Sequence, residues 1–331
     1  MKSVALIIPW YGPFHNYFDL WLQSAAYNDT IDFFIITDND PIINSPPNVH
    51  FIAMAFSEIK KRFEERAGFS VKLSPYKLCD FKPLYGLAFQ DIVGAYDYWG
   101  HCDTDLIFGD IRHFLTDEVL SVERVLQRGH FSLYKNNAKM NYLFKKTALK
   151  DNMAYPYTKA WTTNYSCYFD EFLGMNIVTD LYCTSVIDHR IENIVLDPAA
   201  HRYTFCSDVN QRKYYCRWKE GHLYRQFYNK AGIAEGPEQE YMYLHLQKRN
   251  MKRNIKDEVP VQYYIVPNAF LDEPRFTITE EDEDRYTKEH FRKDRQKNIK
   301  KLRDYGIIPC ITHRLRRRKI DKWLFEHKPG F

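Results

Sequence analysis

The first third of the chain alternates short apolar runs with stretches of helical length. The apolar runs span Val4–Pro9, Ile31–Thr37 and Val49–Ala53. Runs of this length suit strands of a parallel sheet, because such strands are buried on both faces. A helix is expected near Tyr17–Tyr27, and a longer helical stretch over Lys77–Gly94. The pattern predicts an α/β fold with a Rossmann-like, mixed and mainly parallel sheet flanked by helices.

Two aspartates, Asp103 and Asp105, interrupt a segment that otherwise has the pattern of a strand. Side chains alternate faces along a strand, so both carboxylates should point to one side, with Cys102 facing away. Two anions this close are costly unless a cation lies between them, and oxygen ligands suit Mg²⁺ or Mn²⁺. Such ions keep open positions for phosphates, so a diphosphate-bearing ligand is expected. The alternative is a pair of solvated turn residues, but the apolar run Leu106–Phe108 favours the end of a buried strand.

Ligands of open α/β sheets bind beyond the carboxyl ends of the strands. Pro9–Gly12, Thr37–Asp38 and Asp103–Asp105 all follow expected strands, so they should gather at that edge. This arrangement resembles metal-dependent glycosyltransferases of the GT-A fold, particularly the bacterial enzymes that build capsule, exopolysaccharide or lipopolysaccharide. The resemblance covers roughly residues 1–255 and is strongest around 80–110. It implies sugar transfer from a nucleoside-diphosphate sugar, with a UDP-sugar as first choice, to a saccharide or lipid-linked saccharide acceptor.

The resemblance also implies roles for residues near the donor. Pro9 and Tyr11 follow the first strand, where Tyr11 is the expected platform for the nucleobase. Asp38 would accept a hydrogen bond from the base or the ribose. A loop aromatic and a helix cap are the alternatives for Tyr11 and Asp38. Asp80 and Lys82 lie where related enzymes place an acid and a base against the donor sugar and diphosphate, although Asp80 could instead cap a helix.

A late segment, Glu240–Arg249, has the pattern of a strand, with His245 near its end and Lys248 three residues beyond. By the same resemblance, His245 would be the third metal ligand beside Asp103 and Asp105, and Lys248 would contact the diphosphate. Imidazole suits Mn²⁺ better than Mg²⁺, so manganese is the preferred ion. A structural histidine in an apolar setting is the alternative.

Adjacent acids, Asp170 and Glu171, stand among aromatic residues. Burial there would raise a carboxyl pKa towards the range useful for removing a proton. Either acid, and Asp170 first, could therefore take the proton of the acceptor hydroxyl if the enzyme inverts configuration. If it retains configuration, these residues would only bind the acceptor.

Charge divides the chain into an acidic body and a basic tail. Residues 285–331 carry a net charge of +11, whereas the whole chain carries +4. We expect a catalytic domain over 1–270, followed over 271–331 by an acidic connector and a basic, helical tail. A helix is expected from Glu281 to Tyr305, ended by Gly306 and Pro309. In the last part, 311–331, apolar residues recur at helical spacing among cations.

That segment suits an anionic membrane surface. A helix that folds back on the domain is the alternative, and nucleic acid is an unlikely partner because the body is acidic. The seven cysteines are dispersed and odd in number, which is typical of reduced thiols in a cytoplasmic protein. No apolar window reaches the roughly 20 residues of a membrane span, so attachment would be peripheral, at the inner face of the membrane.

Two other function classes stay open. One is another metal-dependent transferase acting on nucleotides, such as a nucleotidyltransferase. The segment Pro9–Gly12 holds a single glycine, so it offers no glycine-rich phosphate loop after the first strand. The other is a non-catalytic module attached to a membrane or to nucleic acid through the basic tail.

Overall fold

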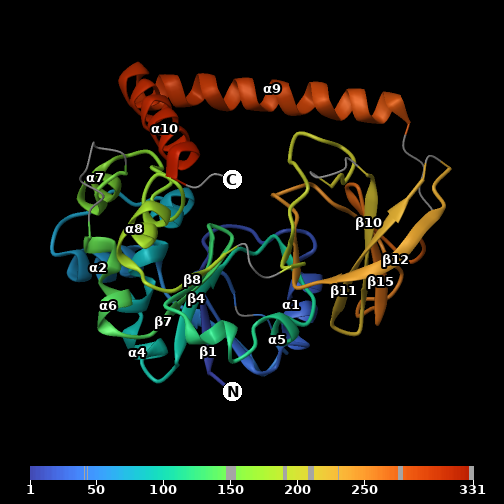
Figure 1. Ribbon diagram of the computed structural model, residues 1–331, viewed down its shortest axis with the longest axis horizontal. Helices are drawn as coiled ribbons and strands as arrows, with labels where there is room; N and C mark the ends of the chain where they lie inside the picture. Colours follow the sequence, from blue (N-terminus) through green and yellow to red (C-terminus); the bar gives the residue numbers. More distant parts are fainter. Residues whose placement is uncertain are drawn as a thin grey trace.

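The computed structural model describes residues 1–40, 42, 44–146, 154–188, 192–207, 212–229, 231–274 and 279–327 (Figure 1). A central seven-stranded sheet has the order β3-β2-β1-β4-β7-β6-β8. Its strands are β1 (Val4–Pro9), β2 (Ile31–Thr37), β3 (Val49–Ala53), β4 (Tyr98–Cys102), β6 (Arg124–Arg128), β7 (Phe131–Lys135) and β8 (Val186–Ile187). The pairs among β3, β2, β1 and β4 are parallel, as is β6 with β8, whereas β7 runs antiparallel to both neighbours. The predicted mixed and mainly parallel α/β sheet is confirmed.

Helices cover both faces of this sheet. Alternation along β1 sends Leu6 to the face covered by α1 (Phe18–Ala26) and Ile7 to the face covered by α2 (Phe56–Ala67). Further short helices of the body are α5 (Ile111–Phe114), η2 (Val119–Ser121), α6 (Ala138–Asn141), η3 (Leu143–Lys145), α7 (Tyr157–Thr162) and α8 (Met175–Tyr182).

The helical stretch expected over Lys77–Gly94 is broken into three pieces. A 3₁₀ segment, η1 (Pro75–Leu84), is followed by α3 (Tyr85–Ala88) and α4 (Gln90–Val93). Pro83 lies inside η1 and has no N–H to donate, which prevents a regular α-helix there.

Two further sheets were not predicted. One joins β5 (Leu106–Phe108), β13 (Tyr243–His245) and β9 (Val195–Leu196) in the order β5-β13-β9. The other has six strands, in the order β12-β11-β10-β15-β16-β14. These strands are β10 (Tyr214–Lys219), β11 (His222–Tyr228), β12 (Ala234–Tyr241), β14 (Lys252–Asn254), β15 (Gln262–Val266) and β16 (Ala269–Leu271). The strand expected over Glu240–Arg249 is therefore divided between β12 and β13, and β13 does end at His245.

The basic tail forms two helices, α9 (Glu280–Tyr305) and α10 (Ile307–His327), and α9 runs across the body (Figure 1). Thr279 and Asp282 make a reciprocal capping box, so the acidic residues expected in a connector form the first turn of α9. Gly306, with φ of 83°, ends α9 as predicted. The predicted stop at Pro309 is wrong, because that residue lies in the first turn of α10, where proline is tolerated.

Within the described ranges, no helix is both long enough and apolar enough to cross a bilayer. Residues 328–331 of the predicted tail lie outside the described part of the chain.

Candidate active site

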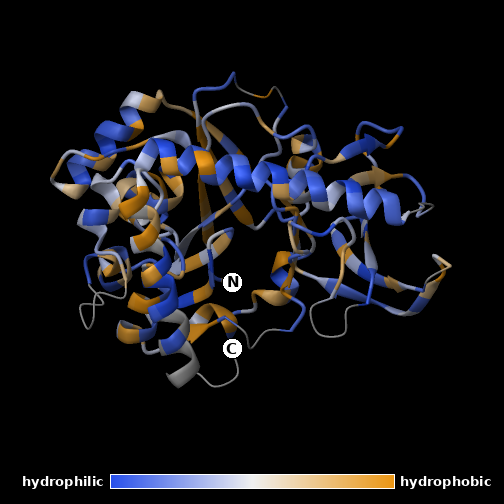
Figure 2. Cartoon of the chain, turned by 90° about the horizontal axis from the view of Figure 1, so that it is seen from above, coloured by the Kyte–Doolittle hydropathy of each residue, from blue (hydrophilic) through white to orange (hydrophobic). Residues whose placement is uncertain are grey.

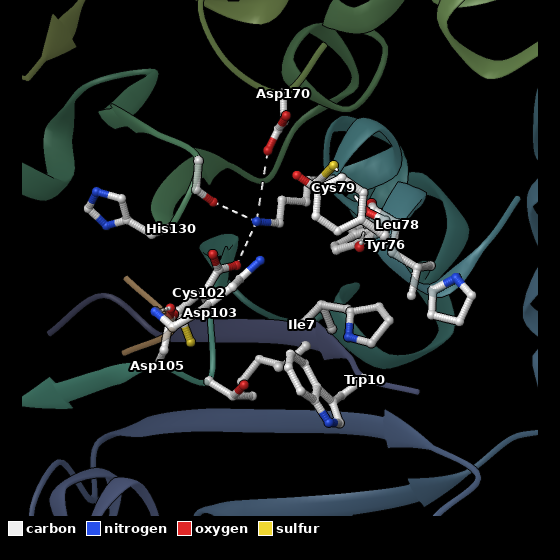
Figure 3. Close-up of a pocket in the computed structure, with 18 of the residues that line it drawn as sticks. Ile7, Trp10, Tyr76, Leu78, Cys79, Cys102, Asp103, Asp105, His130 and Asp170 are labelled. Carbon is white, nitrogen blue, oxygen red and sulfur yellow. Dashed lines mark hydrogen bonds and ion pairs between the residues drawn. The ribbon is translucent and has the colours of Figure 1, made fainter. Parts of the chain in front are cut away.

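A cavity of about 370 Å³ opens at the carboxyl edge of the central sheet (Figure 3). The end of β1, the segment η1, the link between β4 and β5, and the end of β13 all contribute to its walls. Nine of the residues singled out in the sequence line it, namely Pro9, Tyr11, Lys82, Asp103, Asp105, Asp170, Glu171, His245 and Lys248. The fold therefore brings these nine candidate residues, which are far apart in the sequence, to one cavity.

The acid pair lies in a turn. Asp103 and Asp105 follow β4, and the chain resumes extended structure only at β5. The expectation that strand alternation aligns them, with Cys102 facing away, is therefore wrong, and Cys102 also lines the cavity. The carboxylates still converge: oxygens of Asp103 and Asp105 and a nitrogen of His245 lie within 4.8 Å of one another.

Asp105 is 1% exposed, and only one of its two carboxylate oxygens has partners among the described residues. Its Oδ2 accepts the backbone N–H of Lys248 at 2.7 Å and lies 3.6 Å from Nε2 of His245. Its Oδ1 is buried without a hydrogen-bond partner among the described residues. Burial opposes ionisation of Asp105, but His245, Lys248 and His15 together outweigh it and keep the pKa of Asp105 below its ordinary value.

These residues fit a divalent cation. Two carboxylates and an imidazole are a donor set that Mn²⁺ accepts, and Mg²⁺ is served by the carboxylates. The orphaned Oδ1 of Asp105 is a buried anion that such an ion would satisfy.

The turn after β13 holds the backbone in an uncommon conformation. Gln247 and Lys248 have φ of 50° and 57°, in the left-handed region that non-glycine residues rarely adopt. The N–H bond from Lys248 to Asp105, and a second from Leu246 to the carbonyl of Asp105 at 2.8 Å, secure this turn. Backbone strain of this kind is concentrated at functional sites.

Two residues beside His245, Asp197 and His130, were not predicted from the sequence. Asp197 accepts a hydrogen bond at 3.0 Å from Nδ1 of His245, and the ring of His130 stacks on His245 at 4.1 Å between centroids. Burial lowers the pKa of His245, but the flanking Asp105 and Asp197 outweigh it and raise that pKa to about 10. A usable signal existed, because Asp197 directly follows the apolar run Ile194–Leu196, as Asp38 follows β2.

Lys82 lies between two acids. Its Nζ contacts Oδ1 of Asp103 at 2.7 Å, the carbonyl of Gly129 at 2.7 Å and Oδ2 of Asp170 at 3.8 Å, as the dashed lines in Figure 3 mark. Burial would lower the pKa of Lys82, but Asp103 and Asp170 hold it well above its ordinary value. Lys82 thus stays charged and ties the acid pair to Asp170.

The pKa values of the adjacent acids, Asp170 and Glu171, are raised, as expected from their burial. Asp170 is buried, and its burial raises its pKa well above the usual range against the opposing charge of Lys82. Burial also raises the pKa of Glu171, whose Oε1 accepts the N–H of Gly129 at 3.0 Å. Both residues lie in the loop before α8.

Asp80 lies behind the cavity wall instead of in it. Its carboxylate is fully buried, pairs with Lys77 at 2.7 Å, and accepts the N–H groups of Cys167 at 2.8 Å and Phe169 at 3.0 Å. The expected contact with a donor is not what the structure shows for this residue. Its visible role is to hold the segment that carries Asp170.

Tyr11 and Asp38 lie at the carboxyl ends of β1 and β2. Tyr11 donates its hydroxyl to the carbonyl of Met54 at 3.0 Å and packs edge-on against Phe56. Burial, followed by the charge of Asp38, raises the pKa of Tyr11. Asp38 is exposed and outside the cavity lining, so its contact with a base or ribose stays a prediction.

The fold and cavity define an α/β protein with a carboxylate–histidine cluster at the ligand-binding edge of its sheet. The chain belongs to a family of unknown function, DUF6625, whose model matches residues 6–274. No curated protein matches it.

Several solved structures are similar to parts of the chain. One is galactosyltransferase LgtC in complex with donor and acceptor sugar analogues, with 12% identity, a TM-score of 0.31, and coverage of 59% of this chain and 76% of that one. Another is the glycosyltransferase GlyE of Streptococcus pneumoniae TIGR4, with 13% identity, a TM-score of 0.26, and coverage of 57% and 45%. The apo form of GlyE gives 15% identity, a TM-score of 0.28 and the same coverage. At such TM-scores, likeness alone establishes neither a shared fold nor a shared activity.

Proposed function

We propose that this protein is a GT-A-type glycosyltransferase acting in cell-surface polysaccharide synthesis. It would transfer a hexose from a nucleoside-diphosphate sugar, with UDP-sugar as the first choice, to a saccharide or lipid-linked saccharide. The observation that carries this proposal is one cavity that joins the cluster Asp103, Asp105 and His245 to two lysines and to Asp170. Binding a diphosphate donor requires positive charge, which a metal ion at the cluster and a lysine would supply. An attacking hydroxyl requires a base to take its proton.

Asp103, Asp105 and His245 would hold Mn²⁺ or Mg²⁺. When bound, the ion supplies positive charge beside the donor diphosphate. The nucleoside would lie towards Pro9 and Tyr11, at the end of the first strand.

The two lysines would serve different purposes. Lys248 is exposed and has no carboxylate ion pair within the described ranges, so its ammonium is available to neutralise charge on the departing diphosphate. Lys82 is already committed to Asp103 and Asp170, so it would hold these two acids in register.

In the transfer step, the acceptor oxygen bonds to the anomeric carbon while the bond from that carbon to the diphosphate oxygen breaks. The nucleoside diphosphate leaves, and the hydroxyl proton passes to the carboxylate of Asp170 if configuration inverts. A raised pKa makes Asp170 a stronger base once it is ionised. If configuration is retained, Asp170 and Glu171 would bind the acceptor hydroxyls instead.

A panel of sugar nucleotides incubated with the protein and Mn²⁺ tests this proposal. We expect one of them to release nucleoside diphosphate, and Asp105→Ala to abolish that release. Asp29 is exposed and its carboxylate forms no ion pair or hydrogen bond with the described residues, so Asp29→Asn provides a control that should keep full activity. Release of pyrophosphate would select nucleotidyl transfer, and undiminished turnover by Asp105→Ala would refute the metal role.

We also propose that α10 rests on an anionic membrane surface, where a lipid-linked acceptor would be found. Ile308 and Ile311 are exposed, with Arg314 and Arg318 exposed nearby on the same helix. Apolar residues among cations suit an anionic bilayer surface. Replacing both isoleucines with serine should reduce cosedimentation with phosphatidylglycerol vesicles, and equal binding to neutral phosphatidylcholine vesicles would contradict the idea.

A further inference from the structure

A second cavity, of about 200 Å³, lies beside the first. Tyr76 and Tyr168 line both cavities, so the two share a wall. Across from them, Asn298, Lys301 and Tyr305 of α9 line the second cavity. Tyr165, Ser166 and, from α10, Cys310 also line it, so α9 and α10 together form the outer wall of a half-open hollow.

Contacts at both ends hold α9 in that place. Near its start, Tyr286 donates its hydroxyl to the carbonyl of Ala200 at 3.0 Å. At its end, the ring of Tyr305 lies 5.6 Å from that of Tyr165. Beyond it, Arg316 of α10 donates to the carbonyl of Ala154 at 2.8 Å. Figure 1 shows α9 spanning from the side of β10 and β12 to the top of α10.

The face that α9 turns to the cavity is polar. Asn298, Lys301 and Tyr305 stand at i, i+3 and i+7, which places them on one side of a helix. The apolar residues Ile299 and Leu302 are exposed, and Figure 2 shows α9 as mainly hydrophilic. A helix fixed by apolar packing would turn its apolar residues to the body instead. A polar face over a hollow indicates a place for a polar ligand.

The wall of the second cavity combines tyrosine rings with the ammonium group of Lys301, and Lys297 and Lys248 lie close to the ring of Tyr76 without lining this cavity. The Nζ of Lys301 lies 6.0 Å from the ring centroid of Tyr168, and that of Lys297 lies 5.9 Å from the ring of Tyr76. Lys248 also approaches the ring of Tyr76, at 5.3 Å. These three lysines have no ion pair with a carboxylate within the described ranges, and no acid lines the second cavity. Tyrosine faces suit the apolar face of a sugar ring, and the lysines suit an anion.

We propose that the second cavity is the acceptor subsite, and that it takes a saccharide bearing a phosphate or carboxylate group. This inference rests on the proposed glycosyl transfer. A sugar stacked on Tyr76 or Tyr168 would present a hydroxyl across the shared wall, towards Asp170 in the first cavity. The anionic substituent would point towards Lys301 on α9.

Saturation-transfer NMR on the full chain, with UDP and diamagnetic Mg²⁺ present, tests the proposal. The probes are glucose, glucose 6-phosphate, glucuronic acid and inorganic phosphate. We expect at least one anionic sugar to bind more tightly than both glucose and inorganic phosphate. Lys301→Gln should weaken that binding about fivefold, the size of one partly exposed charge contact, and leave glucose binding unchanged. Lys300→Gln is the matched control, because Lys300 is exposed on α9 outside the cavity lining.

Equal binding of anionic and neutral sugars would overturn the proposal, as would an unchanged affinity in Lys301→Gln. Competition by inorganic phosphate as strong as that of the sugar phosphate would also overturn it, because the ring would then contribute nothing. Donor hydrolysis, measured as released nucleoside diphosphate in parallel samples that contain sugar nucleotides and Mn²⁺ in place of UDP, reports separately on glycosyl transfer. If the unaltered protein hydrolysed no donor, the transferase assignment would be refuted. The NMR binding measurements decide separately which class of ligand the second cavity takes.

Discussion

Replacing Asp80 by asparagine tests whether Asp80 holds the segment that carries Asp170 or contacts the donor. Asp80 is 0% exposed and its partner Lys77 is 2% exposed, with 2.7 Å between Nζ and Oδ2. The same ammonium donates to the carbonyls of Ala160 and Tyr165, both at 2.7 Å. Asp80→Asn therefore leaves a buried cation without its anion, in a place where water cannot replace it.

The magnitude follows from that burial. Removing one partner of a buried ion pair costs about 3–5 kcal/mol, because the other charge stays desolvated. Asparagine keeps one oxygen, which can still accept an N–H from Cys167 or Phe169, so we expect the lower end, about 3 kcal/mol. The segment that carries Asp170 would also lose one of its anchors. The variant should therefore lose turnover while its KM for the donor stays nearly unchanged.

Urea denaturation followed by circular dichroism measures the first effect, and initial rates across donor concentrations measure the second. Glu65→Gln is the matched control, because Glu65 pairs with Lys61 on the exposed surface of α2 at 4.0 Å. It should change the free energy of unfolding by less than about 0.5 kcal/mol. A large rise in donor KM for Asp80→Asn, with stability within 1 kcal/mol of the parent, would refute this reasoning and restore the donor contact.

Two further changes probe the cavity. Asp197→Asn weakens the acceptor that orients His245 through Nδ1, so Mn²⁺ affinity measured by calorimetry should fall about 10–100-fold; an unchanged affinity would exclude His245 as a ligand. Asp170→Asn should lower turnover about 10²–10⁴-fold if Asp170 is the base. Because burial raises its pKa, activity of the parent should rise with pH as Asp170 ionises, and the variant should lose that acidic limb. The same acidic limb in Asp170→Asn would assign the titration to another group.

The strands β1 to β4 could be predicted because a parallel strand buried on both faces carries its signal within its own few residues. The hairpin of β10 and β11 was missed, although it also has a local signal. Its two-residue turn, Glu220 and Gly221, has positive φ at both positions, as tight hairpins require. A glycine between two aromatic-rich runs was visible in the sequence and was not used.

Long-range partners could not be predicted in this way. Nothing near Asp80 in sequence shows that its carboxylate accepts the N–H of Cys167, 87 residues away. Asp197 reaches His245 because β9 pairs in parallel with β13, so the carboxyl ends of these two strands lie at the same edge of the sheet. The acid pair was predicted to converge by strand alternation, yet it converges through a turn. The two carboxylates still lie close together, because the apolar runs on both sides fix where the turn lies.

Residues of the basic tail line the second cavity, so the tail also faces the body. The predicted boundary at residues 270 and 271 treats 271–331 as an appendage, yet residues of α9 and α10 line the second cavity, and Arg316 of α10 donates a hydrogen bond to the body. Deleting 311–331 would therefore remove an anchor of α9 as well as any membrane contact, and a loss of transfer would follow from either cause. Serine at Ile308 and Ile311 changes only exposed positions, whereas Lys301→Gln changes only the cavity face. If the two serine substitutions reduce only vesicle binding and Lys301→Gln reduces only sugar binding, the exposed face of α10 and the cavity face of α9 act independently.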